Sequence, residues 1–320
     1  MDAEDFRRYG HDLVDRIADY RANVGKLPVR SNADPGAIRA RLPAEPPVEP
    51  EPFEKVLDDL DRIVMPGLSH WQSPRFFGYF PSNGEPAAVL ADFASTGLGV
   101  LGLAWQSSPA LTEVEEVATD WLRQTLGLSD AWSGVIQDTA STSTLVALLC
   151  ARERASAFSL AKGGLQDCDR PLVVYASEHA HSSVDKAALL AGFGRENLRK
   201  IGVDAHYAMR ADLFARAVEE DRKAGRVPCA VVATSGTTTT TAFDPVGAIA
   251  EVAREHRLWL HVDAAMAGSA MILPELSLFV AGVGPGLCVH RLSRPSRYQW
   301  KSSEGAMNSA ARWPTDGQFA

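Results

Sequence analysis

Residues 258–265 read Leu258-Trp259-Leu260-His261-Val262-Asp263-Ala264-Ala265, an apolar run that ends in a carboxylate and two small residues. A short, mostly apolar run of this kind is typical of a buried strand. A carboxylate at the end of such a strand is costly to bury unless it has a cationic or hydrogen-bonding partner. The stretch therefore predicts a sheet with polar chemistry at the carboxyl end of a strand, and Asp263 as a candidate functional residue.

Similar apolar runs occur earlier in the chain, and stretches with a helical period separate them. The predicted strands are Gly134–Gln137, Leu172–Ala176, Ala230–Ala233 and Leu258–Val262, and the predicted helices are 143–157, 182–190, 211–222 and 246–255. Apolar strands joined by crossover helices predict an α/β fold, with a mostly parallel sheet and helices on both faces. Ligands bind such sheets beyond the carboxyl ends of the strands, so the residues that follow each strand are the site candidates.

The first predicted strand is followed by a hydroxyl-rich turn, Asp138 to Thr144, that leads into a helix. Free backbone N–H groups and the helix dipole at such a turn favour an anion, and phosphate is the expected one. The alternative is ordinary capping of the helix by a serine or threonine. Capping needs only one such residue, whereas this turn has five.

Two further strand ends carry polar residues. His181 lies where the second strand gives way to a helix, and it is either a functional residue or a simple cap. The run Thr237–Thr241 follows the third strand and offers a row of hydroxyl groups. A low-complexity loop is the alternative for this run, but its place after a buried strand favours a role at the sheet edge.

Composition narrows the class of protein. The net charge is −8 without a long basic run, which argues against nucleic acid or an anionic membrane as partner. No apolar stretch is long enough to cross a bilayer, and the acidic start of the chain does not resemble a signal peptide. The cysteines are scattered and form no CxxC pair, so we expect no metal site and a reducing, cytoplasmic location.

The first 60 residues form a separate region in this interpretation. Phe6, Val14 and Ile17 recur at helical spacing in a predicted amphipathic helix, Glu4–Val24. A proline-rich connector, Leu42–Phe53, follows, and its composition favours extended backbone. The connector is either a flexible linker or an ordered arm that lies across another subunit.

The strand-end residues, taken in order, resemble the pyridoxal-phosphate (PLP)-dependent amino-acid decarboxylases of fold type I, and most closely the aromatic-L-amino-acid decarboxylases. The resemblance runs from near the N-terminus to about Glu275, and each segment alone is only modestly specific. The segments that carry it are 70–81 (HWQSPRFFGYFP), 105–110 (WQSSPA), 139–144 (TASTST), 179–183 (HAHSS), 236–239 (GTTT) and 261–265 (HVDAA).

The resemblance implies a role for each matching residue. Thr139, Ala140 and Ser141 would hold the cofactor phosphate, and His181 would stack on the pyridine ring. Thr238 would support His181 or the cofactor. Asp263 would pair with the pyridine nitrogen, and Ala265 would pack against the ring. The residues expected to shape the substrate pocket are Trp71, Tyr79, Phe80 and Pro81.

The resemblance also implies the fold and assembly. It predicts the PLP-dependent transferase fold (fold type I), a homodimer with active sites at the interface, and an amino-acid substrate. The domain prediction is an arm at 1–60, an incomplete PLP-binding domain at 61–275 and an atypical, irregular tail at 276–320. We expect this sequence to lack the small C-terminal domain that the resemblance would imply.

The lysine that such enzymes use to form a Schiff base with the cofactor is not found. The family places it in an Asn-Pro-His-Lys-like motif after the strand that carries Asp263, but the family-like sequence is lost after Glu275. Residues 276–320 carry a net charge of +3, against −11 for the rest, and their one lysine, Lys301, lies in an unrelated context. A disrupted reading frame, a fusion to unrelated sequence and a divergent tail each account for this.

Three functions remain open from the sequence. The first is an active carboxy-lyase that uses Lys301 or a lysine from a partner, and the second is an inactive remnant that at most binds PLP or dimerises. The third is another fold-type I enzyme, such as an aminotransferase or a cysteine desulfurase. The segments 70–81 and 105–110 are decarboxylase-like and argue against the third. Aromatic amino acids lead as substrates, with acidic ones or diaminobutyrate as alternatives.

Overall fold

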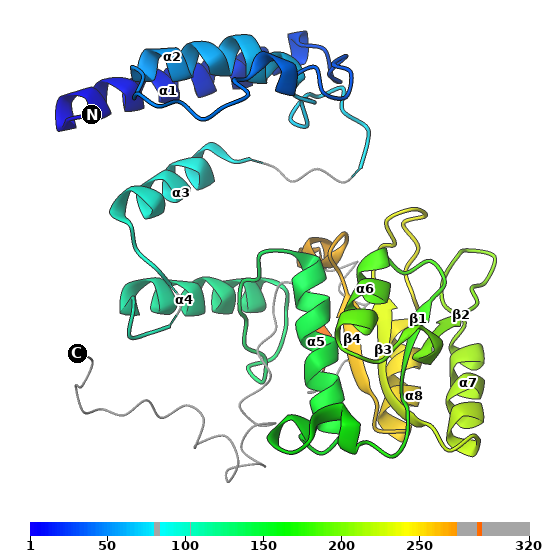
Figure 1. Ribbon diagram of the computed structural model, residues 1–320. Helices are drawn as coiled ribbons and strands as arrows, with labels where there is room; N and C mark the ends of the chain where they lie inside the picture. The colour runs from blue at the N-terminus through cyan, green and yellow to red at the C-terminus, as the bar shows by residue number, and fades with distance from the viewer. Residues whose placement is uncertain (80–83, 103, 274–286, 290–320) are drawn as a thin grey trace. The chain divides into compact units, whose positions relative to one another are not determined.

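The computed structural model describes residues 1–79, 84–102, 104–273 and 287–289 (Figure 1). The chain forms two compact units, Met1–Gly99 and Val100–Ala320. The boundary predicted at residue 60 thus falls inside the first unit.

The first unit is helical. Its α-helices are α1 (Ala3–Asn23), α2 (Phe53–Asp59) and α3 (Pro86–Leu98), and its short helical turns are η1 (Val24–Lys26), η2 (Arg39–Arg41), η3 (Leu60–Val64) and η4 (Met65–Gly67). Asp2 caps α1, because its carboxylate accepts hydrogen bonds from the backbone N–H of Glu4 at 2.9 Å and of Asp5 at 2.8 Å. This cap and the apolar period of the sequence explain why the predicted helix Glu4–Val24 forms.

Helix α1 packs within its own unit through few side chains. Tyr9 is buried, and its ring centroid lies 4.9 Å from that of Phe53 in α2. Phe6, Val14 and Ile17 remain 53%, 44% and 42% exposed. Among the described residues, much of the apolar stripe that predicted the helix is therefore left uncovered.

The second unit holds a five-stranded sheet. Its elements are α4 (Pro109–Thr125), α5 (Ala140–Ala155), η5 (Ser159–Ala161), η6 (Gly164–Asp167), β1 (Leu172–Ser177), α6 (Ser182–Leu190), η7 (Arg195–Asn197), β2 (Leu198–Ile201), α7 (Ala211–Lys223), β3 (Val227–Thr234), α8 (Val246–Glu255), β4 (Trp259–Asp263), η8 (Gly268–Ile272) and β5 (Leu287–Val289). The strand order is β2-β1-β3-β4-β5, and all neighbouring strands are parallel. The prediction of a parallel α/β sheet is confirmed.

Helices cover both faces of this sheet (Figure 1), and successive strand residues point to opposite faces. Along β1, Val173 and Tyr175 belong to the core on one face with Phe214 of α7. Val174 alternates with them and packs on the other face with Leu148 of α5. Each buried apolar side chain of this size contributes roughly 1.5–3 kcal/mol, so the alternation fixes which face each helix covers.

The structure differs from the sequence prediction at three places. Residues 134–137 form no strand; Ile136 is 65% exposed, and its backbone N–H donates to Glu115 Oε1 at 2.7 Å instead of to a neighbouring strand. Strand β2 was not predicted, because its Leu-Arg-Lys-Ile sequence carries little apolar signal. The segment 276–320, expected to be irregular, contains β5 paired with β4; its other residues, including Lys301, lie outside the described part of the chain.

Candidate functional site

The carboxyl ends of β1, β3 and β4 lie at one edge of the sheet, because these strands are parallel neighbours. Ser177, Thr234 and Asp263 are their last residues. Figure 1 shows α5 beginning at the end of the sheet where β4 finishes. The structure therefore brings the segments carrying His181, Thr238 and Asp263 to one edge, as predicted.

Asp263 is buried, with 5% of its surface exposed, at the end of β4. Its Oδ1 accepts a hydrogen bond from the backbone N–H of Ala265 at 3.1 Å, and its backbone oxygen accepts one from Ser235 at 2.8 Å. On the neighbouring strand, Thr234 is in register with Asp263. The hydroxyl of Thr234 is buried and has no hydrogen-bond partner among the described residues. A buried carboxylate and a buried hydroxyl thus lie side by side where the two strands end.

The threonine loop after β3 is tightly closed. The N–H groups of Gly236 and Thr237 both donate to the backbone oxygen of Ala242, at 3.1 and 2.9 Å. Gly236 has a φ of +83°, and a Cβ atom there would lie 3.0 Å from Cβ of Ala267, which follows β4. Glycine is therefore required both by the backbone conformation and by the close approach of the two loops. Thr237 is buried, whereas Thr238 is exposed at the edge.

Asp244, which has no predicted role, ties its own loop to the end of β3 and to the segment before α7. One carboxylate oxygen accepts the N–H of Met209 at 2.7 Å, and the other accepts the N–H of Thr234 at 2.7 Å. Burial raises the pKa of its carboxyl, while the two backbone donors oppose that rise. Its position before Pro245 gives no sign of this role, because Met209 is 35 residues away in sequence.

His181 is the N-cap of α6. Its Nδ1 accepts a hydrogen bond from the N–H of Ser183 at 3.2 Å and lies 2.9 Å from the Ser183 hydroxyl. The capping alternative is therefore correct for Nδ1. Because the cap fixes the imidazole while the side chain stays exposed, a ring-stacking role remains compatible with the structure.

The first turn of α5 has the features of an anion site. Thr139 is the N-cap, and its hydroxyl accepts the N–H of Thr142 at 3.2 Å. Ala140 and Ser141 begin the helix, and within the described residues no acceptor is seen for their N–H groups. Two free N–H groups, two nearby hydroxyls and the positive end of the helix dipole suit a phosphate.

The predicted substrate residues lie in the first unit. Trp71 stacks on Tyr79, with ring centroids 5.3 Å apart and planes at 8°, and also on Phe76 at 5.2 Å. Phe80 and Pro81 lie outside the described residues. The substrate role of these four residues stays a prediction.

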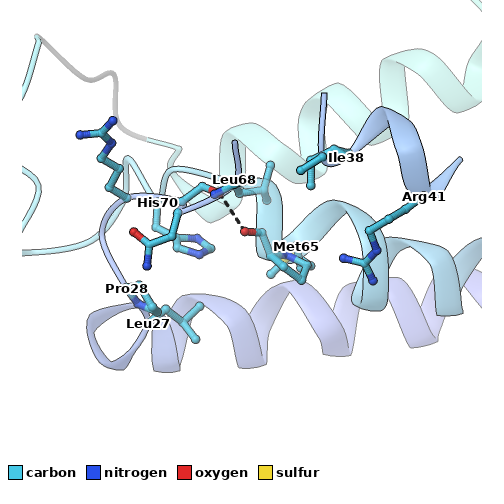
Figure 2. A pocket seen from close by; sticks show the side chains of 13 residues that line it. Leu27, Pro28, Ile38, Arg41, Met65, Leu68 and His70 are labelled. Atoms are coloured by element: carbon cyan, nitrogen blue, oxygen red, sulfur yellow. Dashed lines mark hydrogen bonds between the residues drawn. The ribbon is translucent and has the colours of Figure 1, made fainter. Parts of the chain in front are cut away.

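The first unit also contains a cavity of about 510 Å³, shown in Figure 2. Leu27, Ile38, Met65 and Leu68 give it an apolar lining, and His70 also lines it. None of the predicted site residues lines it. In the described part of the chain there is no cluster of three or more potential metal ligands, and no helix has the length and apolarity needed to cross a membrane.

Comparison with known proteins identifies the family. The family model described as "Pyridoxal-dependent decarboxylase conserved domain" matches residues 35–285, so the resemblance extends beyond Glu275. The chain is 43% identical over 297 residues to aromatic-L-amino-acid decarboxylase of Bos taurus, covering 88% of this chain and 60% of the relative. It is 42% identical over 291 residues to phenylacetaldehyde synthase of Petunia hybrida, covering 88% of this chain and 56% of the relative.

A solved structure gives the same result for the fold. The crystal structure of Oryza sativa TDC with PLP and tryptamine matches with a TM-score of 0.84 and 40% identity, covering 88% of this chain and 62% of that one. The chain thus spans little more than half the length of the curated relatives it matches.

Proposed function

The chain belongs to the pyridoxal-dependent decarboxylase family, and on this premise we propose that the strand-end edge of its sheet binds PLP for the decarboxylation of an aromatic L-amino acid. The observation that carries the proposal is the buried Asp263 at the end of β4, at the same edge as the hydroxyl-rich start of α5. A buried carboxylate there is suited to a cationic ring nitrogen, and the helix start is suited to a phosphate.

The residues present fit the cofactor. Thr139, Ala140 and Ser141 would hold the phosphate through hydroxyl and N–H groups. The unpaired buried hydroxyl of Thr234 leaves a polar atom at this edge for a further hydrogen bond, as expected where a polar ligand binds. Ala265 is small enough to leave room for a flat ring.

The protein's contribution to the reaction is binding, orientation and control of protons. When bound, the cofactor supplies the electron sink for the pair left behind as CO2 departs. Asp263 would keep the pyridine nitrogen protonated, so that the sink stays strong. His181 would lie against the ring with Thr238 supporting it, and Trp71, Tyr79, Phe80 and Pro81 would orient the substrate.

The identity of the substrate is proposed from the relatives. The curated relatives include decarboxylases of aromatic amino acids and a phenylacetaldehyde synthase, and the matching crystal structure contains tryptamine. All of these names refer to aromatic compounds, which supports an aromatic L-amino acid over an acidic one or diaminobutyrate.

The missing lysine motif favours a second form of the proposal: this chain binds PLP but has little or no decarboxylase activity. The lysine of such an enzyme holds the cofactor covalently and moves protons during turnover. Lys301, the only lysine after Asp263, lies in a context unlike the family motif. A chain with Asp263 and the first turn of α5, but without the family's lysine motif, would bind the cofactor reversibly.

The assembly and location are also proposed. A homodimer is supported by the uncovered stripe of Phe6, Val14 and Ile17 on α1, which a second copy would cover. A reducing, cytoplasmic location is supported by Cys150, Cys168 and Cys229, which are all free thiols.

The activity is tested by adding PLP and an aromatic L-amino acid to the full chain, measuring CO2 release, and then mapping borohydride-reduced peptides by mass spectrometry. The second form of the proposal, a chain that binds PLP without catalysis, predicts little or no CO2 and no pyridoxyl group on Lys301. A pyridoxyl group on Lys301, together with CO2 release that Lys301→Ala abolishes, would show instead that the chain is an active carboxy-lyase.

A further inference from the structure

Asp138 introduces a negative charge at the start of α5. It directly precedes the N-cap Thr139, and it is the only charged residue between Ser133 and Ala151. No basic side chain of this segment is therefore available to offset it. A carboxylate before a helix gains from the helix dipole, which is the same interaction that would favour a bound phosphate.

The carboxylate of Asp138 interacts with polar groups of this helix start. The side chain of Thr142 and the backbone N–H of Thr139 lower the pKa of its carboxyl. The hydroxyls of Thr142 and Thr139 are 3.1 Å apart. Asp138 is thus ionised at neutral pH and engages the polar groups that surround the free N–H groups of Ala140 and Ser141.

We propose that Asp138 is an internal competing anion that weakens binding of the cofactor phosphate at the start of α5. The inference rests on the proposed function, because it concerns the same phosphate site. A bound phosphate carries close to two negative charges at neutral pH, so a neighbouring carboxylate repels it.

The test is the affinity of the full chain for PLP, measured by equilibrium dialysis, in the wild type and in Asp138→Asn. Asparagine keeps the shape and an acceptor oxygen but removes the charge. We expect Asp138→Asn to bind PLP roughly tenfold more tightly at low salt, and the difference to shrink as salt increases. Pyridoxal, which lacks the phosphate, should bind the two proteins equally.

Asp130→Asn is the matched control, because Asp130 is an exposed aspartate nearby and its replacement changes the net charge by the same amount. It should leave PLP affinity unchanged. If Asp138→Asn binds PLP no better than the wild type, or if Asp130→Asn or pyridoxal shows the same gain, the inference is wrong although PLP binding itself stands. If no protein in the set binds PLP, the proposed function fails and the inference fails with it.

Discussion

At the scale of single residues, the candidate site depends on side chains that tie loops to one another. Asp263 could be recognised from the sequence because it directly follows an apolar run, and Thr139 because it lies in a hydroxyl-rich turn before a helix. Asp244 could not be recognised in this way. Its two partners, Met209 and Thr234, are 35 and 10 residues away, and only folding brings them together.

Replacing Asp244 tests this residue-scale interpretation. Asp244→Ala leaves two backbone N–H groups without their acceptor, and we expect it to lower the free energy of unfolding by about 2–4 kcal/mol. Asp212→Ala is the control, since the ion pairs of Asp212 with Arg210 and Arg216 are exposed, and this change should cost less than about 1 kcal/mol. Urea unfolding measures both variants. Equal losses would show that Asp244 is no more important than a surface ion pair.

Cys229 provides a test of burial in the sheet. It is 3% exposed, and burial raises its pKa from the usual 9.0 to about 12. The unfolded chain therefore loses the thiol proton at lower pH than the folded one, so the stabilising contribution is complete below pH 9 and is lost as the pH rises toward 12. Relative to Cys229→Ala, the wild type should lose about 2 kcal/mol of unfolding free energy between pH 8 and pH 10.5. Parallel pH profiles of the two proteins would contradict the assigned burial.

At the scale of elements, the helices and strands that could be predicted are those whose apolar spacing can be read within a short stretch of sequence. Helices α6 and α8 have the predicted bounds, because their apolar residues recur at 3.6-residue spacing. Strand β2 was not predicted because it is an outer strand with a neighbour on one side only, and half of the residues of such a strand need not be apolar. The strand predicted at 134–137 does not form, because a strand needs a neighbouring strand to pair with. The apolar composition of a segment does not indicate whether such a neighbour is available.

The junction between the loops after β3 and β4 provides an element-scale test. Gly236→Ala introduces both a left-handed alanine and a close contact with Ala267, so we expect a loss of roughly 2–4 kcal/mol. Gly225→Ala has a similar φ of +77° but meets no atom within 4 Å, and it should cost only about 1–2 kcal/mol. Thermal unfolding compares the two. A smaller loss for Gly236→Ala would mean that the loops are not in contact.

At the scale of the whole molecule, the chain belongs to the pyridoxal-dependent decarboxylase family and has a parallel α/β sheet. We propose that PLP binds where the strands of this sheet end. The second unit contains all of the predicted cofactor residues: Thr139, Ala140, Ser141, His181, Thr238, Asp263 and Ala265. Trp71 and Tyr79, which are predicted to shape the substrate pocket, belong to the first unit. Sequence order alone could not assign these residues to two compact units, because that division depends on long-range contacts.

The most direct test of the central claim is the PLP affinity of Asp263→Ala measured by equilibrium dialysis. Because this change would remove the proposed partner of the ring nitrogen, we expect binding at least about tenfold weaker than that of the wild type. Asp221→Asn is the control, since Asp221 is also buried but accepts a hydrogen bond from Tyr175 instead, 2.9 Å away. PLP binding that is weakened by Asp263→Ala and retained by folded Asp221→Asn supports the claim. Unchanged PLP binding by a folded Asp263→Ala would contradict it.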